Sequence, residues 1–93
     1  MKIFQTPTFV KQVKKLHKNQ KQNLDQAVGA IARDPGLGSV KKGDLCGVRV
    51  YKFSMTRQLA LLAYEFNEDE EALILLALGS HENFYRDLKK KSE

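Results

Sequence analysis

The chain has 93 residues, of which 42% are hydrophobic and 29% are charged. This composition excludes a disordered or collagen-like chain, and the length predicts one small globular domain over residues 1–93. Lysines and arginines number 16 against 11 acidic residues, which gives a net charge of +5. Such a balance suggests a polyanionic partner, nucleic acid first, although the solvated face of a lysine-rich helix has the same composition.

Cysteine content and hydropathy exclude several further classes of protein. The single Cys46 cannot build an intramolecular disulfide framework, and no Cys/His cluster has zinc-ligand spacing, so we expect no metal and no cofactor. The longest apolar run, Ala72 to Leu78, is far shorter than the roughly 20 residues that span a bilayer. The polar start, residues 1–5, lacks a signal-peptide core. We therefore expect a cytoplasmic protein without a membrane partner.

The positive charge is concentrated in the first third of the chain. Residues 1–33 carry seven basic groups and one acidic group, whereas residues 67–71 carry four acids and no base. The sequence therefore predicts a molecule with one electropositive end.

A short strand and a helix are the first predicted elements. Residues 1–5 alternate weakly and stop before Pro7, which favours a strand. Thr6 and Pro7 form a helix-start signal, and the apolar residues that follow recur at spacings of four and three. Four lysines at helical spacing are expected to form a second face of the same helix: Lys11, Lys14, Lys15 and Lys18.

A second helix is predicted to begin near Asn19, with Gln22 three residues later in the manner of a capping box. Three apolar residues repeat the helical spacing: Leu24, Val28 and Ile31. The two helices are expected to form an antiparallel hairpin. The turn residues at 34–36 should end it, and the glycine-rich stretch up to Gly47 predicts a loop.

Three runs rich in β-branched, aromatic or other apolar residues predict strands at 48–55, 58–66 and 72–78. The breaks between them are short enough for antiparallel hairpins. Residues 80–90 predict a short terminal helix with Ser80 as its N-cap. The order is βααβββα, an α+β fold in which a small antiparallel sheet packs on the N-terminal helical hairpin.

This topology brings four chemically active side chains to one end of the sheet. Antiparallel hairpins return the chain to the end from which it came, so Gly79 should lie near the turn at 54–58. We expect the following residues to gather there: Lys52, Arg57, His81 and Tyr85. The acidic turn at 68–71 should lie at the opposite end.

A cation, a histidine and a tyrosine around a nucleic-acid backbone suffice for RNA cleavage by transesterification without a metal. A base removes the 2′-hydroxyl proton, a cation stabilises the charge on the phosphate, and an acid protonates the leaving 5′-oxygen. Each residue also has a structural interpretation: a capping histidine for His81, a solubilising strand lysine for Lys52, and sheet packing for Tyr85. The residues alone leave both interpretations open.

Three stretches of the sequence resemble a known family. They are GVRVYKF at 47–53, LLAY at 61–64 and LLALGSHENFYRDL at 75–88, and they are similar to the toxins of the RelE/ParE superfamily of bacterial toxin–antitoxin pairs. The resemblance covers essentially the whole chain, and the Gly-Ser-His-x-x-x-Tyr ending is its most specific element. Most members are ribosome-dependent mRNA endonucleases, whereas the ParE branch poisons DNA gyrase and lacks the nuclease groups.

The resemblance implies roles for particular residues. Lys52 falls where nuclease members place a lysine or histidine that acts as base or charge stabiliser. His81 falls where they have an arginine or histidine after the last strand. Tyr85 matches an aromatic residue that stacks on the mRNA base.

Two arginines complete the set of residues that the resemblance implies. Arg49 and Arg57 are basic positions on and after the strand that carries Lys52, although alternation puts Arg49 and Lys52 on opposite sheet faces. The best-known nuclease member has an arginine where this chain has Leu61, so Arg57 is expected to supply the missing cation.

The resemblance also implies partners. The first is a small acidic antitoxin. The second is the ribosome with its mRNA, bound through Arg49 and the lysine-rich helical face. The alternative target is DNA gyrase. Because residues 59–66 and 73–78 are apolar on both sides of their strands, a sheet with one helical layer would leave apolar surface in water. We therefore expect the antitoxin to complete the core and to mask Lys52 and His81.

Overall fold

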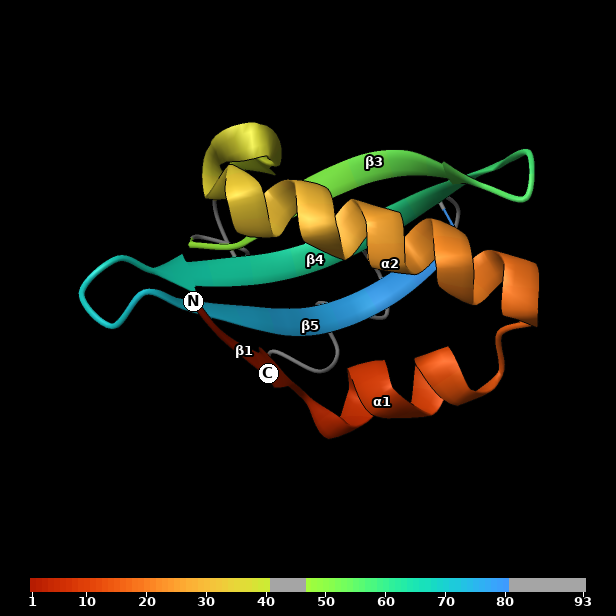
Figure 1. The fold of residues 1–93 in the computed structure, drawn as a ribbon, viewed down its shortest axis with the longest axis horizontal. Helices are drawn as coiled ribbons and strands as arrows, with labels where there is room; N and C mark the ends of the chain where they lie inside the picture. Colours follow the sequence, from red (N-terminus) through yellow and green to blue (C-terminus); the bar gives the residue numbers. More distant parts are fainter. Residues whose placement is uncertain (41–46, 81–93) are drawn as a thin grey trace.

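The structure, a computed structural model, describes residues 1–40 and 47–80 of the chain. A five-stranded sheet forms its centre, with the strands in the order β1-β5-β4-β3-β2 (Figure 1). The strands are β1 (Lys2–Gln5), β2 (Ser39–Val40), β3 (Arg49–Met55), β4 (Gln58–Asn67) and β5 (Ala72–Ser80). The predicted C-terminal helix lies outside the described residues.

The sheet is mixed, so the prediction of an antiparallel sheet is confirmed for β2 to β5 and wrong for β1. Strands β2 to β5 pair antiparallel with their neighbours, but β1 pairs parallel with β5. A parallel pair needs a long crossover connection, and the two helices and the two hairpins between β1 and β5 provide one. The α+β class and the order of the long elements are confirmed. The short β2 and a 3-10 turn (Pro35–Leu37) lie where a loop was predicted.

Helix α1 (Pro7–Lys14) begins at Thr6, whose side-chain oxygen accepts a hydrogen bond from the backbone N–H of Phe9 at 3.2 Å. Helix α2 (Lys18–Arg33) begins at His17, whose backbone N–H donates to the side-chain oxygen of Gln20 at 2.8 Å. The predicted start near Asn19 was therefore late. The capping function falls to Gln20 because it lies three residues after His17, the spacing that lets a side chain reach back to the N-cap.

This boundary corrects the predicted lysine face. Lys11 and Lys14 belong to α1, Lys15 follows it as its C-cap, and Lys18 is the first residue of α2. The four lysines therefore do not share one helix, and the regular spacing from Lys11 to Lys18 runs across a helix boundary. In Figure 1 the chain runs out along α1 and returns along α2, as the predicted hairpin requires, and each helix packs on the sheet, α1 on β5 and α2 on β3.

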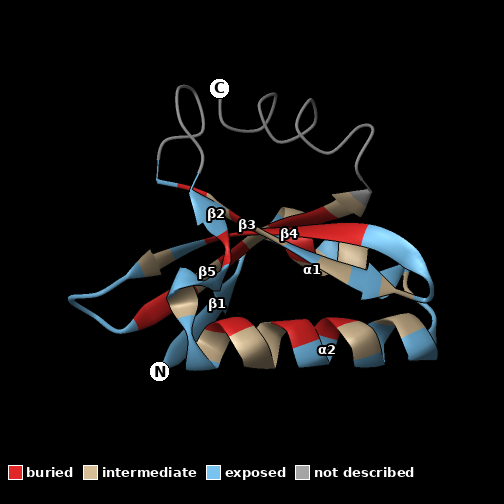
Figure 2. Ribbon diagram, turned by 90° about the horizontal axis from the view of Figure 1, so that it is seen from above, coloured by how far each residue is buried: buried red, intermediate tan, exposed pale blue. Residues whose placement is uncertain are grey.

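Apolar residues are buried on both faces of the sheet. The face toward α2, shown below the sheet in Figure 2, buries Leu24 and Ile31 of α2 with Leu62 and Tyr64 of β4. The other face buries a second cluster: Val48, Val50, Leu61, Ala63 and Ala77, none more than 6% exposed. This part of the face is therefore buried within the chain itself, whereas the prediction that an antitoxin completes the core stays a prediction. Leu59 is not buried in this way, because 49% of it is exposed.

A β-bulge in β5 changes which side chains face the helices. Ala63 pairs with Ala77 and Tyr64 with Leu75, so Leu76 is the extra residue. Leu73, Leu75 and Leu78 consequently share the helix-side core, although strict alternation predicted Leu78 on the other face. Helix α1 occupies the polar groups at the bulge, because the Thr6 hydroxyl donates to the Leu76 carbonyl at 2.7 Å and the Leu78 N–H donates to the Gln12 side-chain oxygen at 2.7 Å.

Among the described residues, neither helix is long and apolar enough to cross a membrane.

Candidate functional site

Lys52 lies in the middle of β3 with its side chain exposed. Its neighbours Tyr51 and Phe53 pack against the helix-side core, so alternation places Lys52 on the opposite face. Across the sheet Lys52 pairs with Leu61, and Leu61 pairs with Gly79. Lys52 is therefore a cation on the sheet face opposite α2, in one row with Leu61 of β4 and with Gly79 near the end of β5.

Arg57 is exposed in the tight turn that joins β3 to β4. Thr56 and Arg57 both have positive φ, 48° and 70°. The backbone N–H of Thr56 donates to the side-chain oxygen of Asn23 on α2 at 2.8 Å. Asn23 thus fixes the turn that carries Arg57, and no local pattern in the sequence indicates this role because the two partners are 33 residues apart.

The end of β5 lies at the same end of the sheet as this turn, as predicted. Ser80 pairs with Ala60, two residues after β4 begins. The acidic turn at 68–71 lies at the other end, about 30 Å away along β4 at roughly 3.3 Å per residue. The two remaining predicted catalytic residues, His81 and Tyr85, lie outside the described residues.

Arg49 lies on the helix side of the sheet, opposite to Lys52, as alternation predicted. It pairs with Tyr64, and its guanidinium donates to the backbone carbonyl of Gly38 at 3.1 Å. The described structure therefore does not bring Arg49 together with Lys52. It gives Arg49 a position that fixes the segment before β2.

Tyr64 joins the same segment to the core. Its hydroxyl donates to the Pro35 carbonyl at 2.6 Å and accepts from the Gly38 N–H at 2.9 Å. Burial raises the pKa of the Tyr64 phenol, while the hydrogen bond from Gly38 and the charge of Arg49 oppose the rise. Tyr64 is therefore a neutral structural residue at physiological pH.

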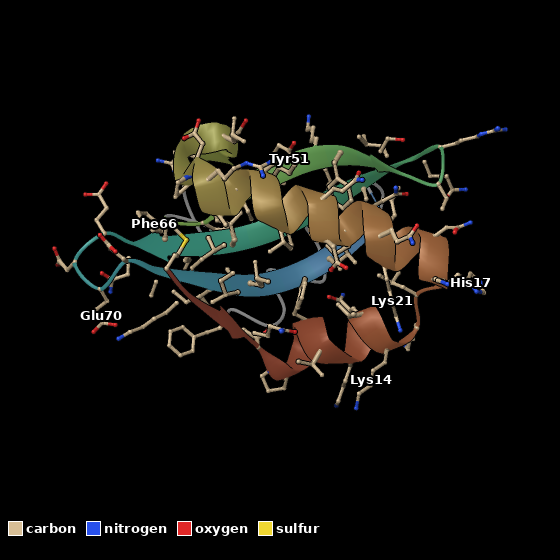
Figure 3. The ribbon with its side chains drawn as sticks, viewed as in Figure 1. Lys14, His17, Lys21, Tyr51, Phe66 and Glu70 are labelled. Carbon is tan, nitrogen blue, oxygen red and sulfur yellow. The ribbon has the colours of Figure 1, made fainter. Side chains whose placement is uncertain are left out.

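A group of cations surrounds the corner where α1 meets α2. In Figure 3, Lys14, His17 and Lys21 lie at this corner, and Glu70 lies at the far end of the molecule. The exposed basic residues of this corner are Lys11, Lys14, Lys15, Lys18 and Lys21. Because Asn23 of α2 contacts the β3–β4 turn, the corner and Arg57 lie at one end of the sheet. The predicted electropositive end is thus present, and it includes Lys21 in addition to the four predicted lysines.

An apolar cavity of about 150 Å³ lies at this end of the molecule. It is lined by Gln12, Leu16, Met55, Gln58, Leu59, Ala60, Leu78 and Gly79. Among the residues that the structure describes, its lining is apolar or uncharged. Within residues 1–40 and 47–80, no cluster of three or more His, Cys, Asp or Glu side chains could hold a metal ion.

The protein is thus a small basic α+β domain, and its candidate site lies at one end of the sheet. Residues 3–89 match the model of a family described as the ParE-like toxin of type II bacterial toxin–antitoxin systems. The chain belongs to this family, which is part of the RelE/ParE superfamily. No curated protein sequence matches it significantly.

Solved structures share the fold at low sequence identity. The Escherichia coli toxin RelE with two arginine-to-alanine substitutions, in the free state, has a TM-score of 0.73 at 15% identity, over 97% of this chain and 95% of that one. The intact E. coli RelBE toxin–antitoxin complex gives 0.70 at 15% identity, over 87% and 96%. The RelBE2 complex from Mycobacterium tuberculosis gives 0.66 at 21% identity, over 86% and 96%.

Family and fold together make this protein the toxin of a type II toxin–antitoxin system. At such identities the solved structures establish the fold, and the choice of target depends on the residues of this chain.

Proposed function

We propose that the protein is a ribosome-dependent endoribonuclease that cleaves mRNA by metal-independent transesterification at the ribose 2′-hydroxyl. The observation that carries the proposal is the row formed by Lys52, Leu61 and Gly79 across three strands. Gly79 is two residues before His81 in the chain, so this row relates the exposed Lys52 to the segment that contains His81 and Tyr85.

The reaction needs three roles, and we assign them as follows. Lys52 acts as base or stabilises the charge on the phosphorus oxygens, His81 transfers a proton to the departing 5′-oxygen, and Arg57 contacts the phosphate. Tyr85 stacks on a base of the mRNA. Leu61, which pairs with Lys52, is fully buried and supplies no charge, so Lys52 and Arg57 are the cations of β3 and its turn on which the proposal depends.

The ribosome is bound through the basic corner. Its lysines are exposed and come from two helices and their connection, which gives a positive surface suited to ribosomal RNA phosphates. The Arg49 guanidinium has further N–H donors beside the one that binds Gly38, and it is a second candidate for phosphate contact, on the helix side of the sheet.

The physiological partner is an acidic antitoxin, as membership of a toxin–antitoxin family implies. Because the sheet face around Leu61 and Ala63 is already buried, the antitoxin is not needed to complete this core. Its proposed role is to cover Lys52 and the basic end, where opposite charge favours association.

A second candidate target is DNA gyrase, because the matching family model describes ParE-like toxins. In that case the basic end binds its target and no residue performs chemistry. The two candidates differ in what Lys52 and His81 do, since a gyrase inhibitor does not require a proton-transfer pair.

Mapping the 5′ ends of cellular mRNA after a brief pulse of expression tests the proposal. New ends within translated codons are expected, and Lys52→Ala or His81→Ala should abolish them and growth arrest, since each role contributes on the order of 10²- to 10⁴-fold to the rate. Ser54→Ala, at an exposed position on the same face of β3, is the matched control and should remain toxic. Intact mRNA together with gyrase-linked DNA breaks would reject the nuclease and support the second candidate.

A further inference from the structure

The turn between β3 and β4 has a backbone conformation that its own residues disfavour. Met55 pairs with Gln58, so Thr56 and Arg57 are the two central residues of the turn. Their φ angles of 48° and 70° correspond to the class of hairpin turn that usually contains Asn-Gly. Positive φ is costly for residues with a β-carbon and most costly for β-branched ones such as threonine. The local sequence therefore does not stabilise this turn.

A side chain from a distant element stabilises it instead. Oδ1 of Asn23 accepts a hydrogen bond from the backbone N–H of Thr56 at 2.8 Å. Asn23 precedes Leu24, which is buried in the core, so the helix that holds the asparagine is itself fixed to the sheet. The Thr56 hydroxyl, by contrast, donates to the adjacent Met55 carbonyl at 2.8 Å, a contact that moves with the turn.

The residue that this arrangement holds in place is Arg57. A turn that had only to connect β3 to β4 would be served by Asn-Gly without any contact from α2. Here a strained position retains a long cationic side chain at the tip of the hairpin that carries Lys52. An arginine recognises phosphate through directional donors, so the orientation of its backbone affects how well it binds.

We propose that Asn23 is a positioning residue that orients Arg57 for contact with an RNA phosphate. The inference rests on the proposed function and assigns to the site a residue that is not in the hairpin. Asn23 acts through the Thr56 amide and not through contact with RNA. It is expected to matter only while Arg57 is present.

Binding to 70S ribosomes programmed with a short mRNA, measured across a salt titration, tests this role. Arg57→Ala should weaken binding and lower the slope of log affinity against log salt by about 0.7, the value of one phosphate contact to a single strand. Asn23→Ala should lower affinity and slope in the same direction, and the double variant should bind no more weakly than Arg57→Ala alone. Gln22→Ala, at the exposed preceding position of α2, should bind like the unaltered protein.

A rescue variant separates positioning from a loss of folding. Thr56→Asn places a residue that tolerates positive φ at the first turn position, so adding it to Asn23→Ala should restore affinity and slope. Additive losses from Asn23→Ala and Arg57→Ala, or an unchanged slope in Asn23→Ala, would overturn the inference while leaving the nuclease proposal in place. Absence of ribosome binding by the unaltered protein would overturn both.

Discussion

The hydroxyl of Tyr64 occupies the space that a β-carbon on Gly38 would need. Such a β-carbon would lie 2.7 Å from the Tyr64 oxygen and 2.8 Å from Cε1 of its ring. The close approach allows the Gly38 N–H to donate to the hydroxyl at 2.9 Å, and Arg49 holds the Gly38 carbonyl from the other side at 3.1 Å. Together with the bond from the Tyr64 hydroxyl to the Pro35 carbonyl, these contacts fix the segment between α2 and β2 to strands β3 and β4.

Replacing Gly38 by alanine should destabilise the protein. The buried ring of Tyr64 is packed in the core and cannot move without disturbing its neighbours, so we expect a loss of about 1–3 kcal/mol in the free energy of unfolding, measured by urea denaturation. Gly29→Ala is the matched control, because nothing lies within 4 Å of a β-carbon there. In the interior of α2 it should stabilise by up to about 1 kcal/mol. Equal effects of the two substitutions would contradict the close contact at Gly38.

Removing the hydroxyl in Tyr64→Phe should destabilise the protein by about 1–3 kcal/mol, because the Pro35 carbonyl and the Gly38 N–H both lose their partner. Tyr51→Phe is the control, since Tyr51 is half-buried and its ring stacks on Phe53 with centroids 6.1 Å apart, a contact that does not need the hydroxyl. Urea denaturation of both variants compares them. A loss as large in Tyr51→Phe as in Tyr64→Phe would argue against the hydrogen-bonded role.

Alkaline pH should destabilise the protein through the same residue. Burial raises the pKa of Tyr64 above its ordinary value of 10.0. At pH values between the unfolded and the folded pKa, the unfolded chain binds fewer protons than the folded one. The contribution of Tyr64 to the free energy of unfolding is therefore fully present below pH 10 and falls as the pH rises through and above that value. Unfolding free energies from pH 8 to 11 should show this fall in the unaltered protein and a smaller fall in Tyr64→Phe. Parallel curves for the two proteins would exclude Tyr64 as the cause.

The elements that the sequence predicted well are those with a strong periodic pattern. The strands over Val50, Leu62 and Leu75 and the two helices follow from alternation and from the three-to-four spacing, and hairpin geometry placed Gly79 beside the β3–β4 turn. The parallel pairing of β1 with β5 depends on which edge of the sheet is open to a short strand, and no local sequence pattern indicates this. The bulge at Leu76 was equally hidden, because a run of apolar residues looks the same on either face.

The candidate site was predictable only in part. Lys52 and Arg57 stand out as cations in and after an apolar strand, and alternation separates Lys52 from Arg49. Asn23 does not stand out, because a polar residue on an amphipathic helix is ordinary until its contact with Thr56 is known. The helix boundary at His17 was missed for a related reason: Gln20 and Gln22 are equally good capping residues in sequence, and only the backbone decides between them.

Because α1 contacts the bulge in β5, we expect a substitution of Gln12 to lower the stability of the protein. Gln12→Leu removes the acceptor of the Leu78 N–H, which should cost about 1–3 kcal/mol and speed amide exchange at Leu78. Gln12→Glu keeps an acceptor oxygen at the same position and should preserve the protection of that amide. Gln26→Leu, at an exposed position of α2, controls for the added apolar surface. Unchanged exchange at Leu78 in Gln12→Leu would show that the bulge does not depend on α1.

The basic corner gives the last prediction. Replacing Lys11, Lys14 and Lys18 together by glutamine should weaken binding to 70S ribosomes and make the remaining binding less sensitive to salt, because each lost phosphate contact removes a released counterion. The three lysines are exposed, so the free energy of unfolding should change little. Because they come from two helices, each single substitution should contribute a similar part of the loss, and no single lysine should account for it.

A control for net charge uses cations away from the corner. Lys2 is exposed on β1, at the edge of the sheet, and Arg33 is exposed in the last turn of α2. Since these two residues lie outside the proposed ribosome-binding surface, Lys2→Gln with Arg33→Gln should reduce the salt slope far less than Lys11→Gln with Lys14→Gln, which removes the same number of charges. Equal reductions would mean that ribosome binding depends on total charge, and unchanged binding in the triple variant would make the lysines of the corner an ordinary solvated surface.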